Sequence, residues 1–186
     1  MRARIVGDTL SLIIEQGEDG LAHLTWFGPQ ADEEMAAAPA FQRLPASPDI
    51  AVGPTLLPEH GRGFHGISQV EGHCGATDRR IRLGQPELIE QDGEILLLAE
   101  DAVLGLKVRT RLSFDGDVLV QEGSVSNTGA QSLSLQRAAS LLFPAPDWAS
   151  EVRTHAGAWA REGNPVTHRW TAGRIEQSAR SGRPGF

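Results

Sequence analysis

The chain has 186 residues, of which 40% are hydrophobic, and its 21 glycines and 11 prolines indicate a globular domain with many turns. Its 17 basic and 24 acidic residues give a formal charge of −7, and the largest basic cluster is the short DRRIR at 78–82, which argues against nucleic acid as a partner. A single cysteine allows no internal disulfide, and no apolar run is long enough to span a membrane.

The sequence pattern of the N-terminal third predicts strands followed by a long loop. The first apolar run is short and lacks a small-residue cleavage site after it, so we predict no signal peptide and a soluble, cytoplasmic protein. Next, TLSLIIEQ at 9–16 and GLAHLTWFG at 20–28 flank the turn sequence GEDG and predict a β-hairpin. Residues 30–41 are the one stretch that favours a short helix. Residues 39–65 are rich in Pro and Gly without a clear period, which predicts a long excursion from the sheets, of a length that is typical of functional or disordered loops.

The stretch LLPEHGRGFHGISQVEGHCGATD, at 56–78, gathers histidines, glutamates and the one cysteine. The nitrogen and sulfur atoms of His60, His65, His73 and Cys74 are of the kind that binds zinc, but their spacing fits no familiar site. Adjacent side chains such as His73 and Cys74 point apart on an extended chain, so we predict no metal site and a passive thiol. No cofactor is expected.

Paired carboxylates would suit sugar hydrolysis, since one protonates the leaving oxygen while the other attacks or activates water. Sequence context does not distinguish the candidates from solvated surface acids, and no catalytic residue is assigned. These candidates are Glu59, Glu71, Glu90, Glu100 and Asp101.

The middle of the chain alternates apolar and polar residues with the period of a β-strand. EILLLAED at 94–101 predicts one strand, and VLGLKVRTRLSF at 103–114 predicts the next. The turn at 115–116 and the returning stretch 117–126 complete a hairpin. The apolar face of the second strand consists of Leu104, Leu106, Val108, Leu112 and Phe114.

The last third continues the same alternation. NTG at 127–129 predicts a turn before the alternating stretch 131–143. Residues 151–162 and 166–178 are strand-like and are separated by GNP. Short strands with regular Gly, Asp and Asn turns predict an all-β fold, a large antiparallel β-sandwich, as one domain over residues 1–186.

Aromatic side chains offer two alternatives, because flat rings stack on the apolar face of a pyranose but also fill the core between sheets. The chain has no tyrosine, so its large aromatic surfaces come from tryptophan and phenylalanine. The candidates are Trp26, Trp148, Trp159, Trp170, Phe27 and Phe64.

Three segments together resemble the amino-terminal region of bacterial α-galactosidases in glycoside hydrolase family 36. They are LTWFGP at 24–29, LLPEHGRGF at 56–64 and the stretch 155–186, which stand in the same order as in that family. The resemblance spans nearly the whole chain, through a Trp-x-Gly-Pro, a Leu-Pro-Glu with a following Gly-x-Gly, and a Trp-x-Arg-Glu.

The resemblance implies a β-supersandwich of the galactose-mutarotase kind, followed in the family by a TIM barrel that carries two catalytic aspartates. This chain stops at Phe186, before any barrel, so we expect an incomplete sandwich region without catalytic residues of its own. The implied parent protein hydrolyses terminal α-galactosides as a homo-oligomer.

In relatives, the stretch after Leu-Pro-Glu often reads Gly-x-Gly-Asp-Phe-Arg and reaches the active site of a neighbouring subunit. Here it reads GRGFHG, so Phe64 matches the phenylalanine, the aspartate is absent, and His65 takes the place of the arginine. The resemblance therefore implies that Arg62, Phe64 and His65 bind a galactoside or oligosaccharide substrate.

Two questions stay open at this point, one about the loop and one about the whole chain. The loop is either a substrate contact or purely structural. The chain is either part of the hydrolase, a free-standing mutarotase-like enzyme, or a sugar-binding or assembly module without chemistry. A mutarotase needs a histidine acid and a carboxylate base, for which His155 or His168 with Glu162 are the candidates.

Overall fold

The computed structural model describes residues 1–31, 55–62, 64, 66–74, 81–139, 142–143, 149–158, 161–170 and 175–176. The strands are β1 (Arg2–Val6), β2 (Leu10–Gln16), β3 (Ala22–Pro29), β4 (Val70–Cys74), β5 (Glu87–Gln91), β6 (Glu94–Asp101), β7 (Leu106–Asp115), β8 (Val118–Asn127), β9 (Leu133–Ala138), β10 (Glu151–Ala158) and β11 (Arg161–Arg169). The helical content of the described residues is one short 3₁₀ turn, η1 (His60–Arg62). The predicted all-β, antiparallel fold is confirmed.

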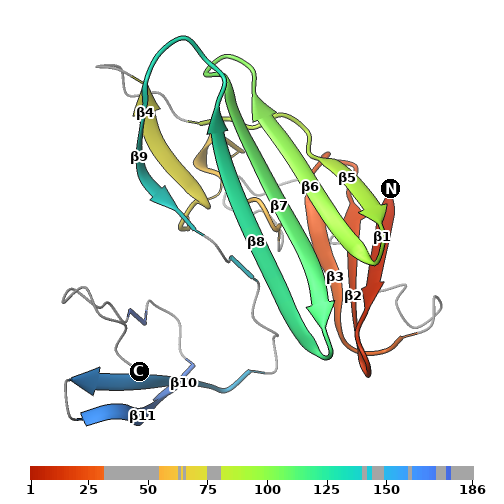
Figure 1. The fold of residues 1–186 in the computed structure, drawn as a ribbon, viewed down its shortest axis with the longest axis vertical. Coiled ribbons are helices and arrows are strands. Elements are labelled where there is room, and N and C mark those ends of the chain that lie inside the picture. Colours follow the sequence, from red (N-terminus) through yellow and green to blue (C-terminus); the bar gives the residue numbers. More distant parts are fainter. Residues whose placement is uncertain are drawn as a thin grey trace, which may run out of the picture. The chain divides into compact units, whose positions relative to one another are not determined.

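The chain divides into two compact units, Met1–Pro144 and Ala145–Phe186. The first contains the sheets β1-β2-β3 and β5-β6-β7-β8 and the pair β4-β9, and the second contains the pair β10-β11. Every pairing in these sheets is antiparallel. Within the first unit, β1 packs against β5, β6 and β7. The pair β4-β9 lies toward the open end of the β7–β8 hairpin, away from its turn (Figure 1). The prediction of a single sandwich domain over 1–186 stays a prediction.

The core of the first unit follows from the alternation in the sequence. Along β7, Leu106, Val108 and Leu112 are buried, while Lys107 and Arg109 on the other face are exposed. One cluster joins buried residues from both larger sheets with Leu56 and Leu57 of the loop before β4. Burial of such side chains contributes roughly 1.5–3 kcal/mol each, which makes this shared interior the main source of stability.

Two turns close the sandwich at one end. Asp117, in the β7–β8 turn, accepts hydrogen bonds from the backbone N–H groups of Thr9 at 2.7 Å and Leu10 at 3.0 Å. Its other oxygen accepts the Thr9 hydroxyl at 2.7 Å. Hydrogen bonds from the Thr9 side chain and backbone lower the pKa of Asp117 below its usual value, and the backbone N–H groups of Leu10 and Asp8 contribute less in the same direction. The turn between β1 and β2 is thereby joined to the turn between β7 and β8.

Several sequence predictions agree with the structure in detail. The hairpin around GEDG is β2–β3, and the strand predicted at 94–101 is β6. The hairpin at 103–126 is β7–β8, closed by Gly116 with a φ of 59°. A φ of this sign favours glycine, which has no Cβ to clash.

Other expectations need correction. GNP does not separate the last two strands but lies inside β11, where Pro165 pairs with His155 and Asn164 with Ala156. Gly163 adopts a φ of 74° and a register shift follows Ala156, so the strand absorbs the glycine without ending. The sequence predicts no partner for the stretch 131–143, and in the structure its strand β9 pairs with β4. The strands β1, β4 and β5 had no sequence prediction, and the helix expected at 30–41 lies outside the described residues after Ala31.

Candidate functional site

The candidate site is the loop of residues 55–69, of which the structure describes 55–62, 64 and 66–69. Two adjacent leucines anchor its start, since Leu56 is fully buried and Leu57 nearly so. The Leu56 N–H donates to the Ala22 carbonyl at 3.1 Å, which fixes the loop to the start of β3. At the far end the Gln69 N–H donates to the Pro58 carbonyl at 3.0 Å and closes the loop on itself.

Glu59 is the centre of this loop. Its side chain is 5% exposed, and one carboxylate oxygen accepts the Leu83 N–H at 2.6 Å. The other oxygen accepts Nε–H of Arg62 at 2.8 Å, and Nη2 of the same guanidinium donates to the Leu83 carbonyl at 2.9 Å. Two hydrogen bonds, both to Leu83, thus connect the loop with the segment before β5, and the bond between Arg62 and Glu59 lies within the loop.

The surroundings of Glu59 shift its titration. Burial raises the pKa of the Glu59 carboxyl above its usual value, and the charge of Asp101 acts in the same direction. The bonds from Leu83 and Arg62 oppose this change without cancelling it. Asp101 is itself buried and accepts the Arg82 N–H at 2.9 Å, so a second carboxylate holds the same segment.

The turn between β2 and β3 supplies a third acid close to Arg62. Asp19 accepts the Leu21 N–H at 2.9 Å and lies 3.0 Å from Nε2 of His23. Partial burial acts to raise the pKa of Asp19, but these two partners and the charge of Arg62 hold it below the usual value. Arg62 is therefore close enough to Asp19 for their charges to interact.

The structure describes two of the three predicted substrate-binding residues, Arg62 and Phe64, and the third, His65, lies outside the described residues. Arg62 ends the turn η1 and is partly buried. Phe64 follows two positions later and is also partly buried, and its ring lies so close to Gly66 that a Cβ there would come within 2.6 Å of Cζ. A cation and an aromatic ring thus lie on the same short loop. Whether they contact a substrate stays a prediction.

The structure also places several of the other sequence candidates. His60 donates from Nε2 to the Gly66 carbonyl at 2.8 Å, so that nitrogen holds the loop. Cys74 is a buried free thiol. Across the described residues, no three His, Cys, Asp or Glu side chains are grouped as metal ligands. His155 and His168 are exposed on β10 and β11, and the side chain of Glu162 is outside the described set.

The aromatic candidates divide between core and surface. Trp26 packs against Ile13 and Ala31, and its indole N–H donates to the Pro29 carbonyl at 3.0 Å. Trp170 is exposed, and Phe27 makes an edge contact with the ring of Phe143. Trp148 and Trp159 lie outside the described residues.

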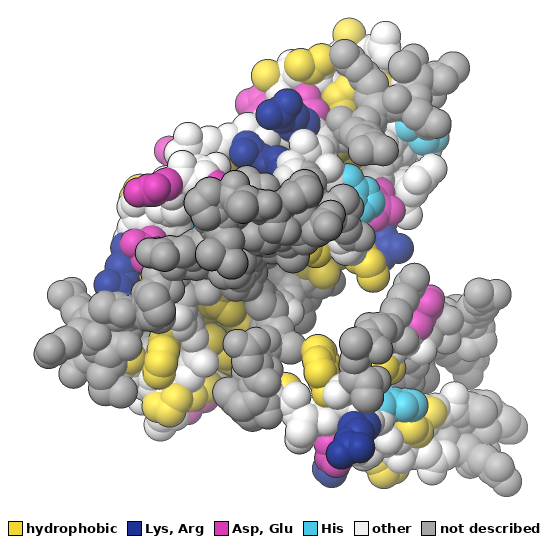
Figure 2. All heavy atoms as spheres, turned by 180° about the vertical axis from the view of Figure 1, so that it is seen from behind, with side chains coloured by type: hydrophobic (Ala, Val, Ile, Leu, Met, Phe, Trp, Pro, Cys, Tyr) yellow, Lys and Arg dark blue, Asp and Glu magenta, His cyan; other side chains and the backbone are white. Residues whose placement is uncertain are grey.

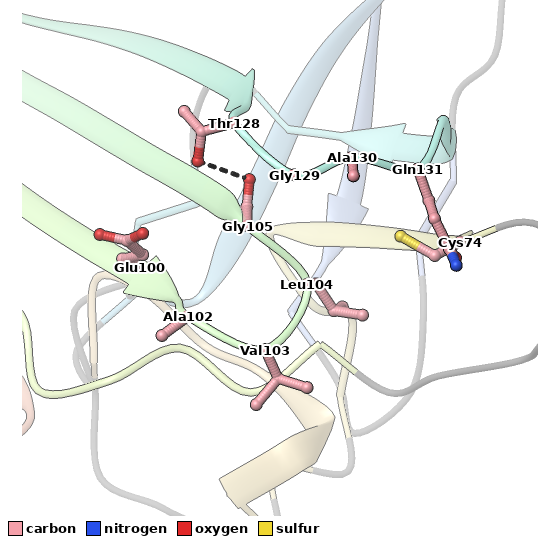
Figure 3. A pocket seen from close by; sticks show the side chains of 10 residues that line it. All are labelled: Cys74, Glu100, Ala102, Val103, Leu104, Gly105, Thr128, Gly129, Ala130 and Gln131. Atoms are coloured by element: carbon pink, nitrogen blue, oxygen red, sulfur yellow. Dashed lines mark hydrogen bonds between the residues drawn. The ribbon is translucent and has the colours of Figure 1, made fainter.

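A separate hollow of about 580 Å³ opens between the β6–β7 and β8–β9 connections (Figure 3). Leu104 and Cys74 form part of its wall, and Thr128 donates to the Gly105 carbonyl at 3.0 Å across one side. Glu100 borders the hollow and pairs with Lys107 at 3.5 Å. Neither Arg62 nor Phe64 is among the described residues that line it, so the hollow is distinct from the loop.

Sequence reasoning missed the special position of Glu59, which it placed among five equivalent acids. The signal was the Leu-Leu-Pro that precedes it, because two buried leucines and a proline carry the next side chain into the interior. The partner segment at 81–84 gave no signal, since Leu83 bonds Glu59 through its backbone.

On the visible face of the surface, acidic and basic side chains are interspersed (Figure 2).

The fold and the loop define an all-β antiparallel sandwich domain with a surface loop fixed by a buried carboxylate. The chain belongs to the glycosyl hydrolase family 36 N-terminal domain family, whose match covers residues 20–186. The resemblance stated from the sequence is thereby confirmed.

Solved structures agree with this assignment. The α-galactosidase AgaA from Geobacillus stearothermophilus is 17% identical over 93% of this chain and 28% of its own, with a TM-score of 0.75. A variant of AgaA in complex with raffinose is 19% identical, with the same coverage and a TM-score of 0.64. An α-galactosidase from Lactobacillus brevis is 19% identical over 91% of this chain and 27% of its own, with a TM-score of 0.58.

At these identities the likeness shows the fold, and the chain spans about 28% of the length of AgaA. Among proteins of curated function, none matches the sequence. In the part of the chain that the structure describes, no helix has the length and apolar character needed to cross a membrane.

Proposed function

We propose that the chain is the non-catalytic β-sandwich region of an α-galactosidase-like hydrolase, whose 55–69 loop forms one side of the entrance for a terminal α-galactoside. The observation that supports this proposal is the fixed loop with Arg62 and Phe64, set in a chain of the family 36 N-terminal domain. A sugar offers hydroxyl acceptors and an apolar C–H face. A guanidinium and an aromatic ring on one loop match both features.

The complex of the related AgaA variant with raffinose makes a galactose-containing oligosaccharide the natural probe. Amide chemical shifts of the ¹⁵N-labelled chain are measured during titration with raffinose, with maltose as the sugar that lacks galactose. We expect the signals of residues 60–66 to move with raffinose only. Equal shifts with both sugars, or none with raffinose, would contradict the proposal.

The non-catalytic role has its own test. The pure chain, made in a host without α-galactosidase, is incubated with a nitrophenyl α-galactoside, and we expect no release of nitrophenol. Turnover by the pure chain would refute this part of the proposal. We further propose that the parent protein works in the cytoplasm as a homo-oligomer. Light scattering on the chain and on the longer protein measures the oligomeric state.

A further inference from the structure

The guanidinium of Arg62 is held along one edge. Nε–H and one N–H of Nη2 lie side by side on that edge, and they meet a Glu59 oxygen at 2.8 Å and the Leu83 carbonyl at 2.9 Å. A guanidinium carries five N–H donors in a rigid plane. Of these, the two inner donors are bonded, and the three on the outer edge have no partner among the described residues.

The acceptor that fixes this edge is itself fixed. Glu59 is 5% exposed and its second oxygen is held by the Leu83 N–H at 2.6 Å, so the carboxylate cannot rotate without breaking that bond. The side chain of Arg62 is 24% exposed, so part of it reaches solvent while its inner edge is enclosed. A buried carboxylate therefore sets the plane of a partly exposed cation.

We propose that Glu59 is a positioning residue, which holds the Arg62 guanidinium so that the outer N–H groups of Nη1 and Nη2 meet adjacent hydroxyls of a galactoside. A planar pair of donors that is already held at one angle loses little side-chain entropy when it binds. The affinity for two neighbouring acceptors is therefore higher than for a mobile side chain. The inference rests on the proposed function, and it assigns Arg62 as the sugar contact and Glu59 as the group that acts through it.

The test is a double-mutant cycle on raffinose binding, measured by ¹⁵N chemical shifts of the 186-residue chain. The variants are Glu59→Gln, Arg62→Ala and the two combined. Glutamine keeps an oxygen for the Leu83 N–H but turns an amide donor toward Nε of Arg62, so it frees the guanidinium without changing side-chain volume. We expect each single change to weaken binding about tenfold, as for loss of a charge-assisted hydrogen bond.

If Glu59 acts through Arg62, the double variant binds no more weakly than Arg62→Ala alone. Additive losses would overturn the proposal, because Glu59 would then contribute by another route. Glu100→Gln is the matched control, since the Glu100 carboxylate pairs with Lys107 on the neighbouring strand and not with the described residues of the loop. This control is expected to bind raffinose as the wild type does.

A second readout does not depend on sugar. The Nε–H signal of Arg62 is expected to exchange slowly with water in the wild type and to vanish in Glu59→Gln, while Glu100→Gln leaves it unchanged. Persistence of the signal in Glu59→Gln would overturn the positioning role. If the wild type binds no raffinose, the proposed function and the galactoside part of the inference both fail, and this signal still decides whether Glu59 sets the guanidinium.

A variant that misfolds is replaced by Arg62→Lys, which keeps the charge and loses the planar pair of donors. We expect it to lose about tenfold in raffinose affinity with a thermal midpoint close to that of the wild type. Wild-type affinity in Arg62→Lys would overturn the proposal.

Discussion

Two carboxylates that both accept backbone N–H groups, Glu59 and Asp117, have pKa values shifted in opposite directions because they differ in burial. Glu59 is enclosed, so burial raises its pKa even though two donors meet it. Asp117 is open to solvent, so the Thr9 and Leu10 donors dominate and its pKa falls. Both residues join parts of the chain that are distant in sequence. Sequence patterns predict neither contact, since alternation reports only which face of a strand is buried.

Replacement of Asp117 by Asn tests its charge at the end of the sandwich. Asparagine retains an oxygen for the two N–H donors, so Asp117→Asn removes mainly the charge. Because the folded-state pKa is lowered, the ionised carboxylate stabilises the fold above the unfolded value near 3.8, and this stabilisation is lost as the pH falls through the folded value. We therefore expect Asp117→Asn to lower the thermal midpoint at pH 7 and to match the wild type in strong acid.

The measurement is the difference in thermal midpoint between wild type and variant across the acid range. Glu87→Gln serves as control, since Glu87 is exposed at the start of β5 and the Thr9 and Leu10 N–H groups donate to Asp117 instead. A difference for Asp117→Asn that stays constant down to strong acid would show that the charge is not what stabilises the turn.

At the scale of elements, the strands with clear alternation were predicted and those without it were not. β6 and β7 alternate over their whole length, and both are buried on one face against the core. β4, with the sequence VEGHC, lies in a glycine-rich stretch, and among the described strands it pairs with β9 alone. Its strand conformation depends on that distant partner, so no local pattern could reveal it. The site loop was identified from its Pro- and Gly-rich composition, and the family resemblance then supplied its candidate residues, because its long-range bonds leave no periodic signal.

The close approach of the loop to the segment before β5 gives a prediction at Gly61. A Cβ on Gly61 would lie 2.6 Å from the Ile81 carbonyl oxygen and 3.1 Å from Cβ of Arg82. Since a backbone oxygen cannot move aside cheaply, we expect Gly61→Ala to destabilise the chain by about 1–3 kcal/mol in urea unfolding. The control is Gly123→Ala in β8, where the nearest atom, the Ala139 oxygen, is 3.9 Å from the added Cβ. Equal stability of the two variants would show that the loop is not packed this closely.

At the scale of the whole molecule, the family resemblance predicted the sandwich and the order of its motifs, but not the division into Met1–Pro144 and Ala145–Phe186. Composition changes little at that boundary, and residues 151–162 and 166–178 have strand-like sequences as the earlier strands do. The division is a property of which strands pair. β10 and β11 pair only with each other among the described strands, which a reading of periodicity cannot establish.

This division predicts how a shortened chain behaves. The main cluster of buried residues runs from Ala3 to Leu112, and the described hydrophobic residues packed against it end at Phe143. A two-stranded hairpin is marginally stable alone, so β10–β11 is expected to contribute little to the unfolding transition. We expect residues 1–144 to fold with a thermal midpoint within a few degrees of the full chain, measured by circular dichroism. A further cut to residues 1–127 removes β9, the partner of β4, and should abolish cooperative unfolding. If residues 1–144 fail to fold while the full chain does, the core depends on the second unit, and the division does not mark independent stability.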